Sequence, residues 1–145
     1  MVGLNVANAF SRYVLLRSID GADEILVFAM AWTVFLGAAL VTARGGHLTI
    51  GLLADSLPPR ARTALAAVIA LATAALAAFV TVQSVGFLDR LFAIGQRSMA
   101  LGLPMWIPHA SVTVGFALIA AIAAWRGIAA LVRLGRGRPD PEAGA

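Results

Sequence analysis

Three long stretches without a charged residue constrain this chain more than any other feature. They cover residues 25–43, 63–88 and 98–125, with lengths of 19, 26 and 28 residues. A helix rises about 1.5 Å per residue, so each stretch can cross a hydrocarbon core of about 30 Å. Only 12% of the 145 residues are charged, against about a quarter in a typical soluble domain. The sequence therefore predicts an all-α integral membrane protein and argues against an ordinary soluble enzyme.

We predict three complete transmembrane helices in a single membrane domain of residues 1–134. The predicted spans are about 22–43, 63–89 and 105–127. Asp23 and Glu24 lie in the first turn of the first span, where the helix dipole favours anions. Pro58 and Pro59 precede the second span, and proline suits a helix start. The lengths and these flanking signals together predict a bundle of three helices.

The two ends of the chain and one loop are expected to behave differently from the spans. Residues 1–16 are too short to cross a bilayer, and we interpret them as the remnant of a first span. The segment 44–62 carries leucines at helical spacing, which favours a short amphipathic cytoplasmic helix over a plain connector. Residues 135–145 are rich in glycine and proline and predict a disordered cytoplasmic tail.

The distribution of arginine predicts the orientation in the membrane. Three crossings place the loop 44–62 and the C-terminal segment on one side with seven arginines, and four arginines on the other. Cytoplasmic loops carry the excess of basic residues. We therefore expect the loop 44–62 and the C-terminus in the cytoplasm.

Small residues predict where the helices pack, because close approach of backbones replaces the hydrophobic driving force inside a bilayer. One predicted contact stripe is Ala66, Ala70, Ala74 and Ala78, at strict four-residue spacing. A second face combines Thr33, Gly37 and Val41, and a third combines Ser111 and Gly115.

The sequence offers no pattern typical of catalysis or cofactor binding. Cysteine is absent, which excludes disulfides and thiolate chemistry. His47 and His109 are expected on opposite sides of the membrane, so they cannot ligate one haem iron. We predict no catalytic residue, no metal, no cofactor and no nucleic-acid partner. The middle of each span lacks an ionisable side chain of the kind that transport pathways use.

An ordered set of short motifs resembles a known family of membrane subunits. The motifs are Asp23-Glu24, Trp32, Phe35-Leu36-Gly37-Ala38-Ala39, Arg44-Gly-Gly-His47, Leu57-Pro58-Pro59-Arg60, Gly86, Gln96-Arg97-Ser98-Met99-Ala100-Leu101, Pro104-Met105-Trp106 and Gly115-Phe116-Ala117. In this order they resemble the small permease subunit of tripartite ATP-independent periplasmic (TRAP) transporters, the DctQ-like family. The resemblance extends from about Asn8 to Leu134, and Asn8 to Tyr13 is similar to the outer end of that family's first span.

This resemblance implies a non-enzymatic role within a larger assembly. The subunit is expected to scaffold a large TRAP permease subunit in the lipid bilayer of the bacterial inner membrane. The assembly is expected to take up an organic acid, driven by a cation gradient, after a periplasmic solute-binding protein has delivered it. The implied interface residues are Glu24, Trp32, Gly37, Arg44, His47, Gln96, Ser98, Pro104 and Trp106. Two alternatives stay open at this point: a small membrane anchor of a redox complex, and a self-associating structural membrane protein.

Overall fold

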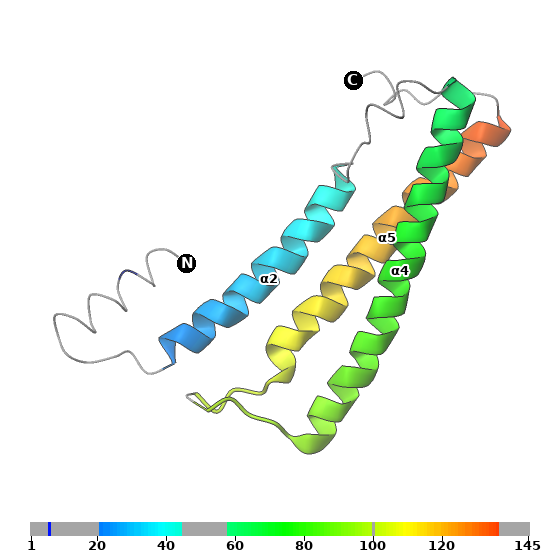
Figure 1. Cartoon of the computed structure of the whole chain (residues 1–145). Helices are drawn as coiled ribbons and strands as arrows, with labels where there is room; N and C mark the ends of the chain where they lie inside the picture. The colour runs from blue at the N-terminus through cyan, green and yellow to red at the C-terminus, as the bar shows by residue number, and fades with distance from the viewer. Residues whose placement is uncertain (1–5, 7–20, 45–57, 100, 137–145) are drawn as a thin grey trace. The chain divides into compact units, whose positions relative to one another are not determined.

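In a computed structural model of the chain, the residues that the structure describes form three long α-helices (Figure 1). The structure describes residues 21–44, 58–99 and 101–136, together with Val6. The helices are α2 (Ala22–Ala43), α4 (Pro59–Ile94) and α5 (Trp106–Gly135). All three are long and apolar enough to cross a membrane. The predicted all-α membrane fold with three spanning helices is therefore confirmed.

The observed helices differ from the predicted spans at their ends. α2 matches the first span, whereas α4 begins four residues before the predicted 63 and ends five residues after 89, and α5 continues from 127 to Gly135. The added turns carry charged residues such as Arg60, Arg90 and Arg133, because a helix can continue into water once it has crossed the hydrocarbon. Apart from Val6, the predicted remnant at 1–16 lies outside the described residues. So do residues 45–57 of the predicted amphipathic segment 44–62, and the tail beyond 136.

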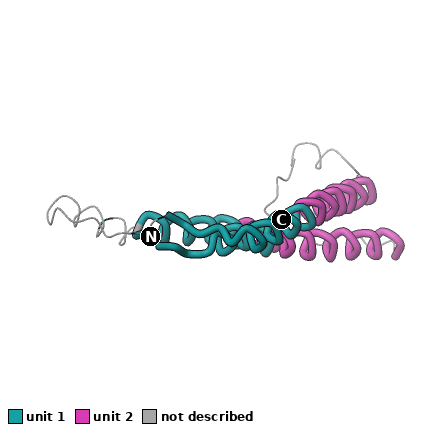
Figure 2. Tube along the Cα trace, turned by 90° about the horizontal axis from the view of Figure 1, so that it is seen from below, with its two compact units in different colours: residues 1–37, 81–115 teal, residues 38–80, 116–145 magenta. Residues whose placement is uncertain are grey.

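The chain divides into two compact units, and each helix contributes one segment to each unit (Figure 2). Unit 1 consists of residues 1–37 and 81–115, and unit 2 of residues 38–80 and 116–145. Unit 1 therefore contains the start of α2, the end of α4, the start of α5 and the loop that joins α4 to α5. Unit 2 contains the end of α2, the start of α4 and the end of α5.

Glycine and proline set the helix boundaries. Gly95 has a φ of +64° and its amide N–H donates to the carbonyl of Leu91, which is a left-handed cap at the end of α4. Gly21 has a φ of +84° immediately before α2. Pro59 is the first residue of α4, as the sequence indicates, and Pro108 lies in the first turn of α5. Proline is tolerated there because the first amides of a helix have no partner within the helix.

Threonine hydroxyls within the helices are satisfied by their own backbone. The hydroxyls of Thr33, Thr42 and Thr73 each donate to the carbonyl four residues earlier, at 2.8–2.9 Å. An unpaired hydroxyl would be costly in hydrocarbon, and this local bond removes that cost without a partner helix. These residues are therefore compatible with a membrane span.

The core of unit 2 uses small side chains from all three helices. Ala39 of α2, Ala77 of α4 and Ile119 of α5 form a buried cluster. On α4 the buried positions also include Thr63 and Ala67, whereas Ala66 and Ala78 of the predicted stripe are exposed. Ala70 and Ala74 are half-buried, so the middle of the stripe is partly covered within this chain and its two ends are not. The reason is that each step of four turns about 40° around the helix, and three steps turn about 120°. Mixed spacings of three and four hold a contact face.

Unit 1 packs α5 closely against α2. Ser111 and Gly115 are buried, as the sequence predicted for this pair. A Cβ added at Gly115 would lie 2.6 Å from the Cβ of Phe35, so only glycine permits this approach of α5 to α2. The hydroxyls of Ser84 on α4 and Thr113 on α5 share a hydrogen bond of 2.6 Å. α5 therefore contacts both other helices within this unit.

Candidate functional site

The loop between α4 and α5 is an ordered hairpin. The amide of Met105 donates to the carbonyl of Gln96 (3.0 Å), and the amide of Ser98 donates to the carbonyl of Leu103 (2.8 Å). Arg97 and Pro104 face each other as an isolated antiparallel bridge. We call the described residues of this loop, 95–99 and 101–105, the α4–α5 hairpin. These hydrogen bonds define the backbone shape of this segment. The sequence showed its motif residues but not their pairing.

Glu24, in the first turn of α2, holds this hairpin through its carboxylate. Its Oε2 accepts a hydrogen bond from the Ser98 hydroxyl (2.6 Å) and another from the Leu101 amide (3.1 Å). The Ser98 hydroxyl oxygen also accepts a bond from the Leu103 amide (3.1 Å). Hydrogen bonds to an ionised carboxylate are among the stronger ones in proteins. The structure thus joins two predicted interface residues, Glu24 and Ser98, that lie 74 positions apart in the sequence.

An apolar contact supports the same arrangement. The Leu101 side chain occupies the space that a Cβ at Gly21 would need. Gly21 is buried and has a positive φ, so a larger residue there would meet both a clash and backbone strain. The hairpin is therefore held on the start of α2 by a carboxylate and by a leucine. Leu101 belongs to the quoted motif, but nothing in the sequence indicates its pairing with Gly21.

Aromatic contacts connect the end of α4 with the start of α5. Phe92 and Trp106 stack with ring centroids 5.1 Å apart and an interplanar angle of 24°. The ring centroids of Phe87 and His109 are 5.1 Å apart, and the His109 Nδ1 atom lies 2.8 Å from the carbonyl oxygen of Met105. The imidazole is thus engaged in packing and in a contact with its own helix. Neither aromatic partner of α4 was singled out from the sequence.

The remaining predicted interface residues are not gathered into one cluster. Trp32 and Gly37 lie half-buried along α2, and a Cβ added at Gly37 would have no atom within 4 Å. Arg44 follows α2 and is exposed. In the hairpin, Gln96 is exposed and Pro104 is half-buried. His47 lies outside the described residues.

A second polar feature lies in unit 2, at the end of α2. Arg126 of α5 donates from one terminal nitrogen to the carbonyls of Thr42 (3.0 Å) and Ala43 (3.4 Å). The last carbonyls of a helix lack partners within the helix and carry partial negative charge, so a guanidinium stabilises them. In the sequence, Arg126 stands out only as part of the charge balance, because its pairing with α2 depends on tertiary structure.

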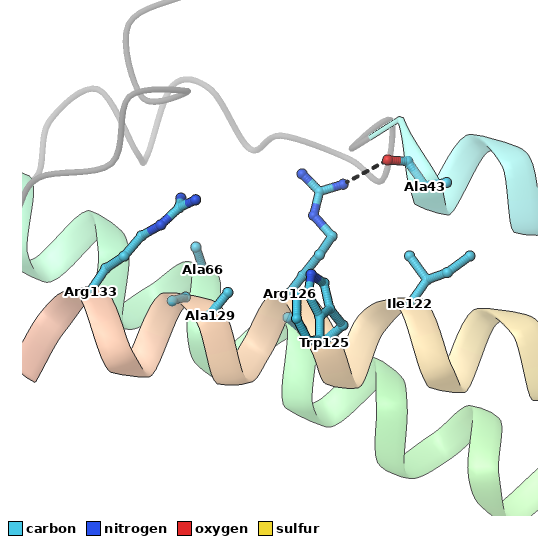
Figure 3. Close-up of a pocket in the computed structure, with 9 residues that line it drawn as sticks. Ala43, Ala66, Ile122, Trp125, Arg126, Ala129 and Arg133 are labelled. Carbon is cyan, nitrogen blue, oxygen red and sulfur yellow. Dashed lines mark hydrogen bonds between the residues drawn. The ribbon is translucent and has the colours of Figure 1, made fainter.

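An open cavity of about 380 Å³ adjoins this contact (Figure 3). Its walls come from α2, α4 and α5 within unit 2, and alanine predominates among them. The lining residues are Ala43, Ala66, Ala70, Ile122, Trp125, Arg126, Ala129, Ala130 and Arg133. Figure 3 shows the Arg126 and Arg133 side chains extending from the same side of α5. The cavity therefore combines an apolar floor with two cationic groups.

These features define an α-helical membrane protein whose polar contacts secure a hairpin in unit 1 and a helix end in unit 2. The family comparison is more specific. Residues 1–134 match the family model described as tripartite ATP-independent periplasmic transporters, DctQ component. The chain therefore belongs to the DctQ family, a family of small membrane components of TRAP transporters and not of enzymes. This confirms the resemblance seen in the sequence.

A curated relative agrees with this family. The chain is 31% identical over 111 residues to the ectoine TRAP transporter small permease protein TeaB of Halomonas elongata. The match covers 77% of this chain and 58% of the relative. The chain thus aligns with a little over half the length of that relative.

Proposed function

We propose that this chain is the small permease subunit of a TRAP transporter and that it braces a large permease subunit in the bacterial inner membrane. The DctQ family match over residues 1–134 carries this proposal. The complete system takes up an organic acid, driven by a cation gradient, and a periplasmic solute-binding protein delivers the solute. The subunit itself supplies a fixed surface against which the large permease is held.

The exposed apolar surface of the helices supports a bracing role. In the most apolar segments, 11% of the residues are buried in α2, 17% in α4 and 28% in α5. Large side chains such as Met30, Leu76 and Val82 are more than 60% exposed. Each of these surfaces must meet lipid or another helix in the membrane. A subunit that mainly presents helix faces is suited to packing against a larger partner.

We assign the α4–α5 hairpin to the periplasmic side of the membrane. Gln96, Ser98, Pro104 and Trp106 form or flank it, and Glu24 fixes it to α2. We propose that this ordered rim lies where the solute-binding protein docks. Arg44 and His47, with the C-terminus, then belong to the cytoplasmic side, where they contact the large permease or anionic lipid.

Cysteine cross-linking tests the bracing role directly, because the chain contains no cysteine. Leu76→Cys places a thiol on an exposed position of α4, and the adjacent Ala77→Cys places one at a position that is 3% exposed. In cells that co-express a TRAP large permease carrying single cysteines along its outer helices, Leu76→Cys is expected to yield a heterodimer and Ala77→Cys is not. Solute uptake in cells that lack the subunit should fall to background.

The two alternatives give different results in the same experiment. Cross-linking of Leu76→Cys to a second copy of this chain, without any to the permease, would favour a self-associating protein. A redox anchor is not favoured by the family, and haem absorbance in the purified chain would be needed to revive it. Undiminished uptake after deletion of the gene would contradict the bracing role.

A further inference from the structure

One polar side chain of α4 lies on an exposed face of the helix without a partner. Gln83 is exposed, and among the residues that the structure describes none forms a hydrogen bond with its side-chain amide. The next residue behaves differently, because the Ser84 hydroxyl shares a hydrogen bond of 2.6 Å with Thr113 of α5. The described helices therefore satisfy the hydroxyl of Ser84 and leave the amide of Gln83 unpaired.

Gln83 lies deep in the hydrocarbon of the membrane. Phe92 stacks on Trp106 with ring centroids 5.1 Å apart, so these two residues are at one level, and tryptophans concentrate at the membrane–water boundary. Gln83 precedes Phe92 by nine residues of α4, which places it about 13 Å below that level in a hydrocarbon core of about 30 Å. Its Cα–Cβ bond tilts toward the start of α4, away from this boundary. The amide is thus too deep to reach water, and an unpaired amide in hydrocarbon is costly.

The surroundings of Gln83 suit a second helix better than lipid chains. Gly86 and Arg90 follow it by three and seven residues on the same side of α4, and both are exposed. A Cβ added at Gly86 would meet no atom within 4 Å, so packing within the chain does not require glycine at this position. The missing side chain leaves a shallow recess beside the amide, where another backbone can approach closely. Transmembrane helices associate through this combination of close packing and interhelical hydrogen bonds.

We propose that the face of α4 formed by Gln83, Gly86 and Arg90 docks one transmembrane helix of the large permease, and that this helix carries a hydrogen-bonding side chain opposite Gln83. The inference rests on the proposed function, which supplies the partner. Charge argues against a second copy of this chain on the same face. Two copies share one orientation in the membrane, so pairing their α4 faces would bring the two Arg90 side chains together, and like charges repel. Asp89 lies about 100° away around the helix and does not offset them.

Co-purification tests this face with a co-expressed TRAP large permease that the unaltered chain retains in a mild detergent. Gln83→Leu keeps a side chain of similar size and removes the amide, so it should weaken permease binding about fivefold. Val85→Leu is the matched control, because Val85 is 45% exposed at a similar depth and lies about 160° from Gln83 around α4. It should change the affinity less than twofold. Equal effects of the two variants would overturn the proposed face.

A change at Gly86 tests the recess separately. Gly86→Leu adds a side chain at an exposed position, so the isolated chain should keep its thermal stability, whereas permease binding should fall about tenfold or more. In cells, Gly86→Cys should cross-link to single cysteines of the permease and Val85→Cys should not. Cross-linking of Gly86→Cys to a second copy of this chain instead would contradict the assigned partner.

Failure of this inference can be distinguished from failure of the proposed function. If the unaltered chain retains no TRAP large permease, the proposed function is wrong and this face loses its partner. If the unaltered chain retains the permease, and Gln83→Leu and Gly86→Leu retain it equally well, only the assignment of this face is wrong.

Discussion

The bond between Glu24 and the α4–α5 hairpin gives the most direct test of the local structure. Glu24→Ala removes an acceptor for the Ser98 hydroxyl and for the Leu101 amide. Hydrogen bonds to a charged group contribute about 1.5–3 kcal/mol each. Since the Leu101 bond is exposed, we count little for it and take only the bond from the half-buried Ser98, at about 2 kcal/mol. The hairpin should then open more readily by about 2 kcal/mol in free energy.

Hydrogen exchange measured by mass spectrometry on the protein in nanodiscs reads this change. Amides of the hairpin, including Leu101 and Leu103, should exchange about 30-fold faster in the variant. Asp89→Asn, at an exposed acidic position near the end of α4, is the matched control and should leave these rates unchanged. Glu24→Gln keeps an acceptor oxygen and should give an intermediate effect.

A double-mutant cycle separates the Glu24–Ser98 bond from other effects. Ser98→Ala removes this bond and also the acceptor for the Leu103 amide. Because both single variants lose the same Glu24–Ser98 bond, the sum of their effects on the free energy of hairpin opening should exceed the effect of the double variant by about 1 kcal/mol or more. A coupling of less than about 0.3 kcal/mol, or hairpin exchange that is unaffected by Glu24→Ala, would refute the bond as the element that holds the hairpin.

Three other outcomes can be checked on the same protein. Gly115→Ala should lower the free energy of unfolding in detergent by about 1–3 kcal/mol, because the added Cβ would clash with Phe35. Gly86→Ala adds a Cβ that meets nothing within 4 Å, so it should be neutral or stabilising by up to about 1 kcal/mol. Similar losses for both variants would argue against close packing at Gly115. Arg126→Gln should speed amide exchange in the last turn of α2, and unchanged rates there would exclude the cap. In cells, an impermeant maleimide should label Met99→Cys from the periplasm and leave Arg136→Cys unlabelled, and the reverse pattern would invert the proposed orientation.

The positions of the helices could be predicted from the sequence because they depend on local properties. Length, apolarity and the absence of charge are sufficient for a span, since a membrane helix satisfies its own backbone. The third span was predicted to start at 105, and α5 starts at Trp106. Pro59 was predicted to precede the second span, and it is the first residue of α4. The ends were less predictable, because charged residues such as Arg60 and Arg133 leave the membrane without ending the helix.

The contacts of the candidate site could not be predicted, because they depend on tertiary structure. Glu24 and Ser98 were both selected, but separately, and nothing local indicates that they bond. Gly21 was not selected, although Leu101 packs on it. The alanine stripe on α4 illustrates the same limit: composition indicated a small-residue face, and the rotation of the helix decided that Ala67 and Ala77 were buried in place of their neighbours.

The observed contacts suggest why polar residues are placed at the two ends of α2. α2 has the smallest buried share of the three helices, at 11%, and lipid supplies little hydrophobic force to hold it against its neighbours. Glu24 is bonded at its first turn, and Arg126 is bonded to the carbonyls of its last turn. Between them, Gly115 lets α5 approach Phe35. α2 is thus secured by directed bonds at its ends, by the close contact at Phe35 and by Ala39 in the buried cluster of unit 2. Most of its apolar surface remains available to lipid or to a partner subunit.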